Sequence, residues 1–233
     1  SHTASFGVAD NGIAYIQGNC QAKGYANAKL QYNTVTGEAE VLAPNYISIT
    51  DKKDALYDND ENKANLDPDV LAISHAAWDA VKDQMEEGLG TVDRSITRRA
   101  KIGKSTNTIA GNWLAGLMLE ATKDMNTVVA FTNSGGIRCD LMMEEGATTR
   151  NITVGDIYTI SPFGNRLLTF DATGAELAKT VENAFRNANY GDQFSGMFVK
   201  YKATTGTDGR PVRTVTSIVL DDGTVVDIHD NTK

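Results

Sequence analysis

Alternating apolar and polar positions predict β-strands in the first 50 residues of the chain. Residues Gly12–Gln17 and Ala28–Tyr32 show this alternation, which places every second side chain on one face of a strand. The polar segment Asn33–Gly37, which precedes Glu38–Leu42, has the composition of a hairpin turn. We therefore expect the N-terminal part to be rich in β-structure.

A helical pattern follows an acidic polar stretch at residues 51–65, which is expected to be a loop or linker. Asp67 is a good N-cap, and Pro68 suits the first position of a helix. The pattern predicts one helix of about five turns that ends near Gly88 and packs by a single face. Its apolar positions are Val70, Ile73, Ala77, Val81 and Met85.

The second half of the chain mixes the two kinds of pattern, and this mixture predicts an α/β (α+β) fold with a mixed sheet. We expect helices at Thr108–Thr122 and Gly174–Ala188, and strands at Thr127–Phe131, Arg166–Phe170, Phe198–Lys202 and Val212–Leu220. The expected organisation is a β-rich part at residues 1–60, an acidic linker and connector helix at 61–90, and a larger domain at 91–233.

Charge and composition narrow the possible functions of the 233 residues. The formal net charge of −8 argues against binding a nucleic-acid polymer, which requires a basic face. Three histidines and two cysteines exclude a multi-histidine metal centre built from this chain alone. Cys20 and Cys139 can be paired or free. No run of about 18 apolar residues is present, so no membrane-spanning helix is expected.

A glycine-paired turn follows the strand expected at Thr127–Phe131. Gly135 and Gly136 allow backbone N–H groups to approach a ligand closely. Arg138 adds a planar fork of donors for phosphate, carboxylate or ribose oxygens. The alternative is a tight turn with a surface arginine.

A second irregular turn lies at Ser161–Asn165. Phe163, between a proline and a glycine, can present its ring as a stacking platform, and Asn165 can then contact a base edge or a hydroxyl group. The alternative is a core phenylalanine in a loop.

Taken together, these segments resemble the C-terminal domain of the 5'-nucleotidase family, which includes bacterial UDP-sugar hydrolases and animal ecto-5'-nucleotidases. Their order and spacing both match. The matching segments are Ala110–Ala115, Thr132–Arg138, Thr153–Ile157, Ser161–Asn165, Thr173–Leu177 and Phe194–Phe198. In the family, this domain holds the nucleoside while a metal pair on the N-terminal domain activates the attacking water.

The resemblance implies a role for each matching residue. Phe163 resembles one face of a sandwich that stacks on the base, and Arg138 resembles a contact to ribose or phosphate. Further substrate-binding candidates are Asn133 and Asn165 for the base, Gly135 and Gly136 for the turn, and Lys104 at the position of a further arginine in some members.

The N-terminal part resembles the closing strands of the family's metallophosphatase domain. His2 then corresponds to one ligand of the metal pair, which would be zinc, manganese or a similar divalent ion; the alternative is that Ser1–His2 remains from a tag. The other metal ligands of the family would fall before residue 1, and its second stacking phenylalanine would fall after Lys233. The chain alone is therefore expected to contain no catalytic residue and to hold no metal.

The expected partners are a nucleotide or nucleoside and an N-terminal metallophosphatase domain outside this chain. The resemblance implies an extracytoplasmic location, at the cell surface, secreted or periplasmic. One alternative is a non-catalytic binding or interaction module of a surface or secreted protein. Another is an acidic domain stabilised by calcium through the loop at Asp58–Asn62.

Overall fold

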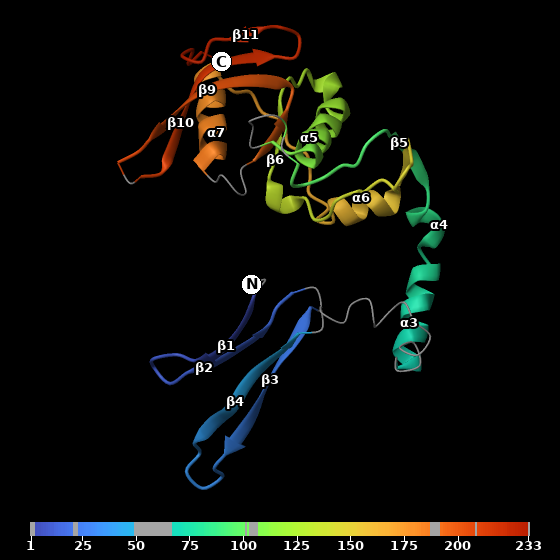
Figure 1. Ribbon diagram of the computed structural model, residues 1–233, viewed down its shortest axis with the longest axis vertical. Helices are drawn as coiled ribbons and strands as arrows, with labels where there is room; N and C mark the ends of the chain where they lie inside the picture. Colours follow the sequence, from blue (N-terminus) through green and yellow to red (C-terminus); the bar gives the residue numbers. More distant parts are fainter. Residues whose placement is uncertain are drawn as a thin grey trace. The chain divides into compact units, whose positions relative to one another are not determined.

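The computed structural model describes residues 3–20, 23–48, 67–100, 102, 107–186, 192–207 and 209–232 (Figure 1). The chain divides into two compact units, Ser1–Trp78 and Asp79–Lys233, which we call the first and second units. His2, Lys104 and the calcium-loop candidate Asp58–Asn62 lie outside the described residues.

The first unit contains two antiparallel hairpins, which confirms the expected β-structure. They are formed by β1 (Ala4–Val8) with β2 (Ala14–Gly18), and by β3 (Gly24–Tyr32) with β4 (Ala39–Ser48). The predicted turn closes the second hairpin, because Asn33 N–H donates to the Glu38 carbonyl and Gly37 N–H to the Asn33 carbonyl, both at 2.8 Å. Gly37 has φ +76°, which favours glycine.

The connector is two helices rather than one, so the prediction of a single helix to Gly88 was wrong. Asp67 does cap the first, α3 (Pro68–Asp79), because its Oδ1 accepts from the N–H groups of Asp69 at 3.0 Å and Val70 at 3.2 Å. Val81, at φ −122° and ψ −6°, leaves helical geometry before α4 (Lys82–Met85). No residue of α3 is buried, so the expected packing of its apolar stripe is not seen in the described residues.

Residues 88–92 also differ from the prediction. They form a strand, β5 (Gly88–Val92), that pairs antiparallel with β7 (Arg150–Thr153). The glycines were interpreted as a helix stop, but Gly90 adopts φ +152° within an extended segment instead. Pairing with a distant strand decides the conformation here.

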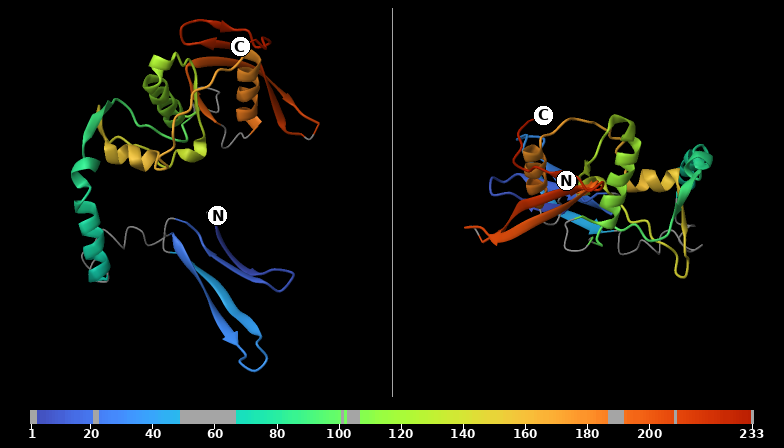
Figure 2. Two further views of the ribbon diagram at one scale, coloured as in Figure 1. Left: turned by 180° about the vertical axis from the view of Figure 1, so that it is seen from behind. Right: turned by 90° about the horizontal axis from the view of Figure 1, so that it is seen from above.

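The second unit contains the expected helices and most of the expected strands, and it is α+β, as predicted (Figure 2). Its described strand pairs are antiparallel and form one sheet of order β11-β10-β9 and the pairs β5-β7 and β6-β8. The remaining elements are α5 (Ile109–Ala121), η2 (Lys123–Met125), β6 (Ala130–Thr132), η3 (Ser134–Gly136), α6 (Val154–Ile160), α7 (Gly174–Arg186), β8 (Gln193–Ser195), β9 (Met197–Thr205), β10 (Pro211–Leu220) and β11 (Val225–Val226).

Two hydrophobic clusters form the core of the second unit. In the first, α7 packs on β10, and the cluster contains the fully buried Val181 and the buried Phe185 of α7 together with Ile218 of β10. In the second, Ala110 of α5 and Ile160 of α6, both fully buried, surround Ile137 and its neighbours. The second cluster therefore supports the segment that contains the glycine-paired turn.

A group of buried polar contacts, here called the α5–β8 joint, ties helix α5 to strand β8. It consists of Asn107, Thr108, Gly111, Gln193 and Phe194. Gln193 Oε1 accepts from Thr108 N–H at 2.7 Å and from Thr108 Oγ1 at 3.0 Å. Asn107 donates to the Phe194 carbonyl at 2.7 Å and accepts from its N–H at 2.8 Å. A Cβ on Gly111 would collide with the Gln193 side chain, so only glycine fits there.

The strand predicted at Arg166–Phe170 is absent. The segment is irregular, and Leu168 and Phe170 are 84% and 81% exposed. Its apolar residues favour a strand, but a strand needs a neighbour for its backbone hydrogen bonds, and no described strand pairs with it. No helix in the described part of the chain is both long enough and apolar enough to cross a bilayer.

Candidate functional site

The glycine-paired turn is held by Asn133 and its own backbone. Gly136 N–H donates to the Asn133 carbonyl at 3.0 Å, which closes η3. The Asn133 side-chain amide lies against both glycines: a Cβ on Gly136 would be 3.0 Å from its Oδ1, and a Cβ on Gly135 would be 3.3 Å from its Nδ2. The two glycines therefore allow this amide to lie closer to the backbone than other residues would permit.

Arg138 is fixed at both its backbone and its side chain. Its N–H donates to the Ile160 carbonyl at 2.8 Å, and its Nη1 donates to the Gly135 carbonyl at 2.9 Å. Ile137, immediately before it, is buried in the second cluster. The guanidinium is therefore held close to the turn while remaining partly accessible to solvent.

Phe163 lies beside Arg138 and is not a core residue. Its side chain is 56% exposed, and the Arg138 Cζ lies 5.6 Å from the centroid of its ring, within the range of a cation–π contact. Gly164, at φ +59°, turns the chain immediately after it, and the exposed Asn165 follows on the same loop.

The structure thus brings together five of the candidates, and these are Asn133, Gly135, Gly136, Arg138 and Phe163. Asn165 lies on the Phe163 loop, while Lys104 and His2 fall outside the described residues. That these residues bind substrate stays a prediction.

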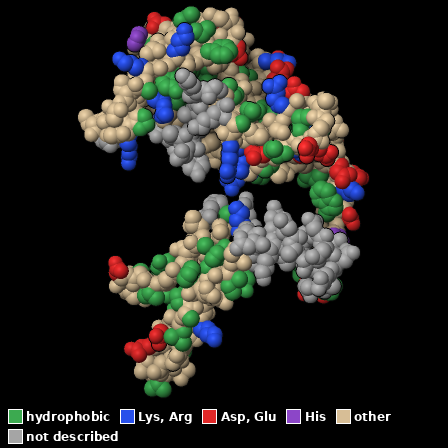
Figure 3. Space-filling model, in the orientation of Figure 1, with side chains coloured by type: hydrophobic (Ala, Val, Ile, Leu, Met, Phe, Trp, Pro, Cys, Tyr) green, Lys and Arg blue, Asp and Glu red, His purple; other side chains and the backbone are tan. Residues whose placement is uncertain are grey.

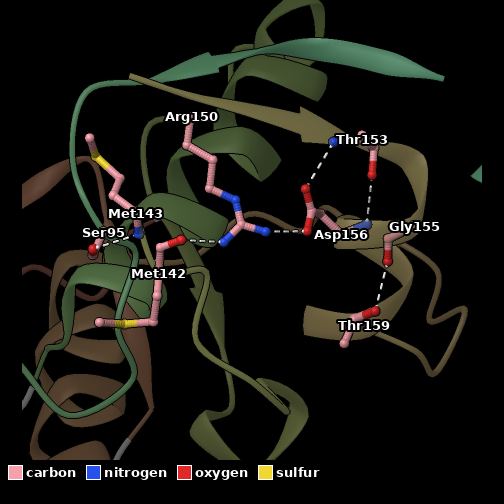
Figure 4. Close-up of polar contacts among 8 residues, drawn as sticks. All are labelled: Ser95, Met142, Met143, Arg150, Thr153, Gly155, Asp156 and Thr159. Carbon is pink, nitrogen blue, oxygen red and sulfur yellow. Dashed lines mark hydrogen bonds and ion pairs between the residues drawn. The ribbon is translucent and has the colours of Figure 1, made fainter. Parts of the chain in front are cut away.

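Sequence reasoning missed Arg150 and Asp156. Through these two residues, helix α6 is connected to the segment at Met142 (Figure 4). Arg150 Nη2 donates to Asp156 Oδ1 at 2.6 Å, and Nη1 donates to the Met142 carbonyl at 2.6 Å. Thr153 and Asp156 form a capping box at the start of α6. The pattern of a threonine followed three residues later by an acidic residue signals that box, but no local signal reveals the contact with Met142.

The thiol of Cys139 lies next to Arg138 in the sequence and is partly buried. Burial raises the pKa of Cys139, and the positive charge of Arg98 offsets part of this effect. The thiol therefore stays neutral at pH 7 and brings no negative charge next to Arg138. Cys20 and Cys139 are each a free thiol in the structure.

Two cavities in the second unit lie away from this turn. One of about 450 Å³ is lined by residues that include Asn112 and Phe194, and one of about 600 Å³ by residues that include Arg94 and Trp113. Neither is lined by Arg138 or Phe163 in the described part of the chain. On the visible face of this unit, acidic and basic side chains are interspersed without one large basic field (Figure 3).

The implied metal pair does not fit the described residues. They contain no group of three or more histidine, cysteine, aspartate or glutamate side chains placed to hold a metal ion. One histidine outside them, His2, cannot hold two divalent ions alone. We therefore derive no chemical step through a metal in this chain.

Comparison with known proteins identifies the family to which this chain is similar. The family model described as "5'-nucleotidase, C-terminal domain" matches residues 84–232. A cell wall protein of Listeria monocytogenes is 27% identical over 208 residues, which is 86% of this chain and 26% of that protein. A probable 5'-nucleotidase of Treponema pallidum is 35% identical over 88 residues, 36% of this chain and 14% of that protein.

A further relative and a solved structure extend the comparison. An NAD 5'-nucleotidase of Haemophilus influenzae is 29% identical over 117 residues, 48% of this chain and 18% of that protein. The crystal structure of a 5'-nucleotidase precursor from Thermus thermophilus superposes with a TM-score of 0.60 at 19% identity, covering 97% of this chain and 42% of that chain. The likeness to the Thermus thermophilus structure shows the fold alone. This chain spans about a quarter or less of the three curated relatives.

Proposed function

This chain belongs to the 5'-nucleotidase family through the C-terminal domain at residues 84–232, and we propose that it recognises the nucleotide in a metal-dependent phosphoester hydrolase. The observation that carries the proposal is the pairing of an exposed aromatic ring with a fixed guanidinium, Arg138 Cζ lying 5.6 Å from the Phe163 ring centroid. A nucleotide needs both groups, because it combines a flat base with an anionic phosphate.

Each group has a separate role in the proposal. A base stacked on the Phe163 ring gains about 1–3 kcal/mol, as bases do on aromatic side chains. Arg138 then donates to ribose or phosphate oxygens, and its bond to the Gly135 carbonyl limits where the guanidinium can point. The amides of Asn133 and Asn165 contact the base, and Gly135 and Gly136 leave room for it. Lys104 adds a second cation.

We assign metal binding and attack on phosphorus to an N-terminal metallophosphatase domain outside this chain. In this assignment residues 1–60 are the closing strands of that domain, 61–90 the linker and connector, and 91–233 the nucleotide-binding domain. His2 would be the single metal ligand contributed from this chain. The absence of a metal-ligand cluster in the described residues is compatible with this division.

The proposed location is extracytoplasmic. It is supported by the names of two similar proteins, a cell wall protein and a 5'-nucleotidase precursor. The first of these also favours a second candidate function, a non-catalytic module of a surface protein, because it matches 86% of this chain and its name states no activity.

Titration of the chain with adenosine and AMP, followed by ligand NMR, separates the two functions. Recognition predicts weak binding of both ligands, because one aromatic face must offset the cost of association. Phe163→Leu should lower the affinity for both ligands by about 5- to 150-fold, the equivalent of 1–3 kcal/mol. Arg138→Gln should remove the preference for AMP over adenosine.

Phe198→Leu is the matched control, because Phe198 lies in β9 and is 70% exposed. It should leave both affinities unchanged. Binding that is absent, or that is insensitive to Phe163→Leu and Arg138→Gln, refutes the recognition role and leaves the non-catalytic module.

A further inference from the structure

Arg150 is the link between the segment that carries Arg138 and the segment that carries Phe163. Its two terminal nitrogens bond in different directions, one to Asp156 in α6 and the other to the Met142 carbonyl, each at 2.6 Å (Figure 4). The side chains of Arg150 and Asp156 are only 28% and 18% exposed. An ion pair of this kind is less screened by solvent than one between exposed side chains.

Asp156 is itself held rigidly. Its Oδ2 accepts from Thr153 N–H at 3.1 Å, and its own N–H donates to Thr153 Oγ1 at 3.2 Å. Its two carboxylate oxygens are thus divided between the cap of α6 and Arg150. Any position that Arg150 imposes on Asp156 is therefore transmitted to the start of α6.

The Met142 carbonyl, which is the second acceptor of Arg150, is also anchored. Leu141, before Met142, is buried and exchanges backbone hydrogen bonds of 2.9 Å with Ile96 in both directions. Met143, after it, donates its N–H to Ser95 Oγ at 2.9 Å. The Met142 carbonyl is thus a fixed point for Arg150.

The link reaches the candidate site through both segments. Helix α6 ends at the fully buried Ile160, whose carbonyl accepts from Arg138 N–H at 2.8 Å, and Phe163 follows three residues later. Arg138 lies four residues before Met142. Arg150 therefore fixes the start of the segment that ends at Phe163 and a point close to Arg138.

We propose that Arg150 is a positioning residue for nucleotide recognition, which sets the placement of Arg138 against Phe163 without touching the ligand. An arginine is required because its planar fork directs two separate nitrogens at two acceptors in fixed directions, whereas the donors of lysine all lie on one nitrogen. The ligand part of this inference rests on the proposed function. The placement of Arg138 against Phe163 can be measured without any ligand.

The first test follows the side-chain N–H resonance of Arg138 by NMR in the full 233-residue chain. The Phe163 ring current shifts this resonance, and Phe163→Leu gives its position without the ring. Arg150→Met should move the resonance to the Phe163→Leu position, and Arg150→Lys should move it part of the way. Thr159→Ala is the matched control, because it removes a 2.8 Å bond to Gly155 within α6 and no bond to residues 137–143.

The second test is a double-mutant cycle on AMP affinity. Arg150→Met should weaken AMP binding in the native background and have no further effect in an Arg138→Gln, Phe163→Leu background, because the groups it places are gone. If Arg150→Met does not fold, Arg150→Lys replaces it in both tests.

The outcomes separate this inference from the proposed function. An Arg138 resonance that stays at its native position in the Arg150 variants overturns the inference, as do fully additive losses in the cycle. A resonance that moves as expected, in a chain that binds no AMP, refutes the recognition role while supporting the placement of Arg138 by Arg150.

Discussion

Replacing Gly111 by alanine tests whether the α5–β8 joint stabilises the second unit. The new Cβ would overlap the side chain of Gln193, which is 2% exposed and cannot move into solvent without repacking. Its displacement breaks the bonds that Gln193 Oε1 accepts from Thr108 N–H at 2.7 Å and Oγ1 at 3.0 Å. The substitution therefore adds one methyl group and disrupts a buried polar network.

The expected loss of unfolding free energy follows from three contributions. A buried donor left without its acceptor costs about 1–3 kcal/mol. Overpacking costs about another 1–3 kcal/mol, while the better helix propensity of alanine returns at most about 1 kcal/mol. The net destabilisation is about 3 kcal/mol. For a unit of this size it lowers the melting temperature by roughly 6–12 °C.

Gly116→Ala provides the matched control on the same helix. Its Cβ would meet Ser195 Oγ at 3.7 Å, an ordinary contact, so the substitution should be neutral or stabilising by up to about 1 kcal/mol. Urea unfolding followed by the fluorescence of Trp113, in a Trp78→Phe background, reports on the second unit alone. A Gly111→Ala chain as stable as the Gly116→Ala chain would refute the reasoning.

Two further substitutions test a helix cap and a buried thiol. Thr173→Ala should lower the unfolding free energy by about 1 kcal/mol in the same assay, because Thr173 Oγ1 accepts from Glu176 N–H at 3.1 Å at the start of α7. Unchanged stability would contradict this role of Thr173. In a Cys20→Ser chain, alkylation of Cys139 can be measured by mass spectrometry as a function of pH. The alkylation rate should rise at a higher pH in the folded than in the urea-unfolded chain, because burial raises the pKa of the folded thiol. The contribution of this thiol to folding stability is then complete below its pKa in the unfolded chain. It is lost as the pH rises through its pKa in the folded chain. Equal midpoints would show that the thiol is not desolvated.

The elements predicted correctly are those whose signals are local. Helix α5 begins where Thr108 caps it, with Oγ1 accepting from Gly111 N–H at 3.0 Å, and its apolar spacing is visible in the sequence. The hairpin at Asn33–Gly37 depends on turn residues that need no distant contact. The same holds for the two irregular turns, which Gly135 and Gly136 and the residues around Phe163 already mark in the sequence.

The predictions that were wrong concern segments whose conformation depends on residues far away in the sequence. Gly88–Val92 becomes a strand because Arg150–Thr153 pairs with it, although its glycines resemble a helix end. The apolar segment Arg166–Phe170 has strand propensity but no partner among the described strands. The contact between Arg150 and the Met142 carbonyl joins a strand end to a loop, and periodicity carries no information about it.

The first unit has a further consequence for the dynamics of the chain. None of its described residues is buried, and its described strands pair as two two-stranded hairpins, which contact each other. Such hairpins are marginal in water by themselves, because they bury too little apolar surface to offset the entropy of ordering. Their backbone amides should therefore exchange with solvent through openings of low free energy. The amides of β9 and β10, which share a buried cluster with Val181 of α7, should exchange only through opening of the whole second unit.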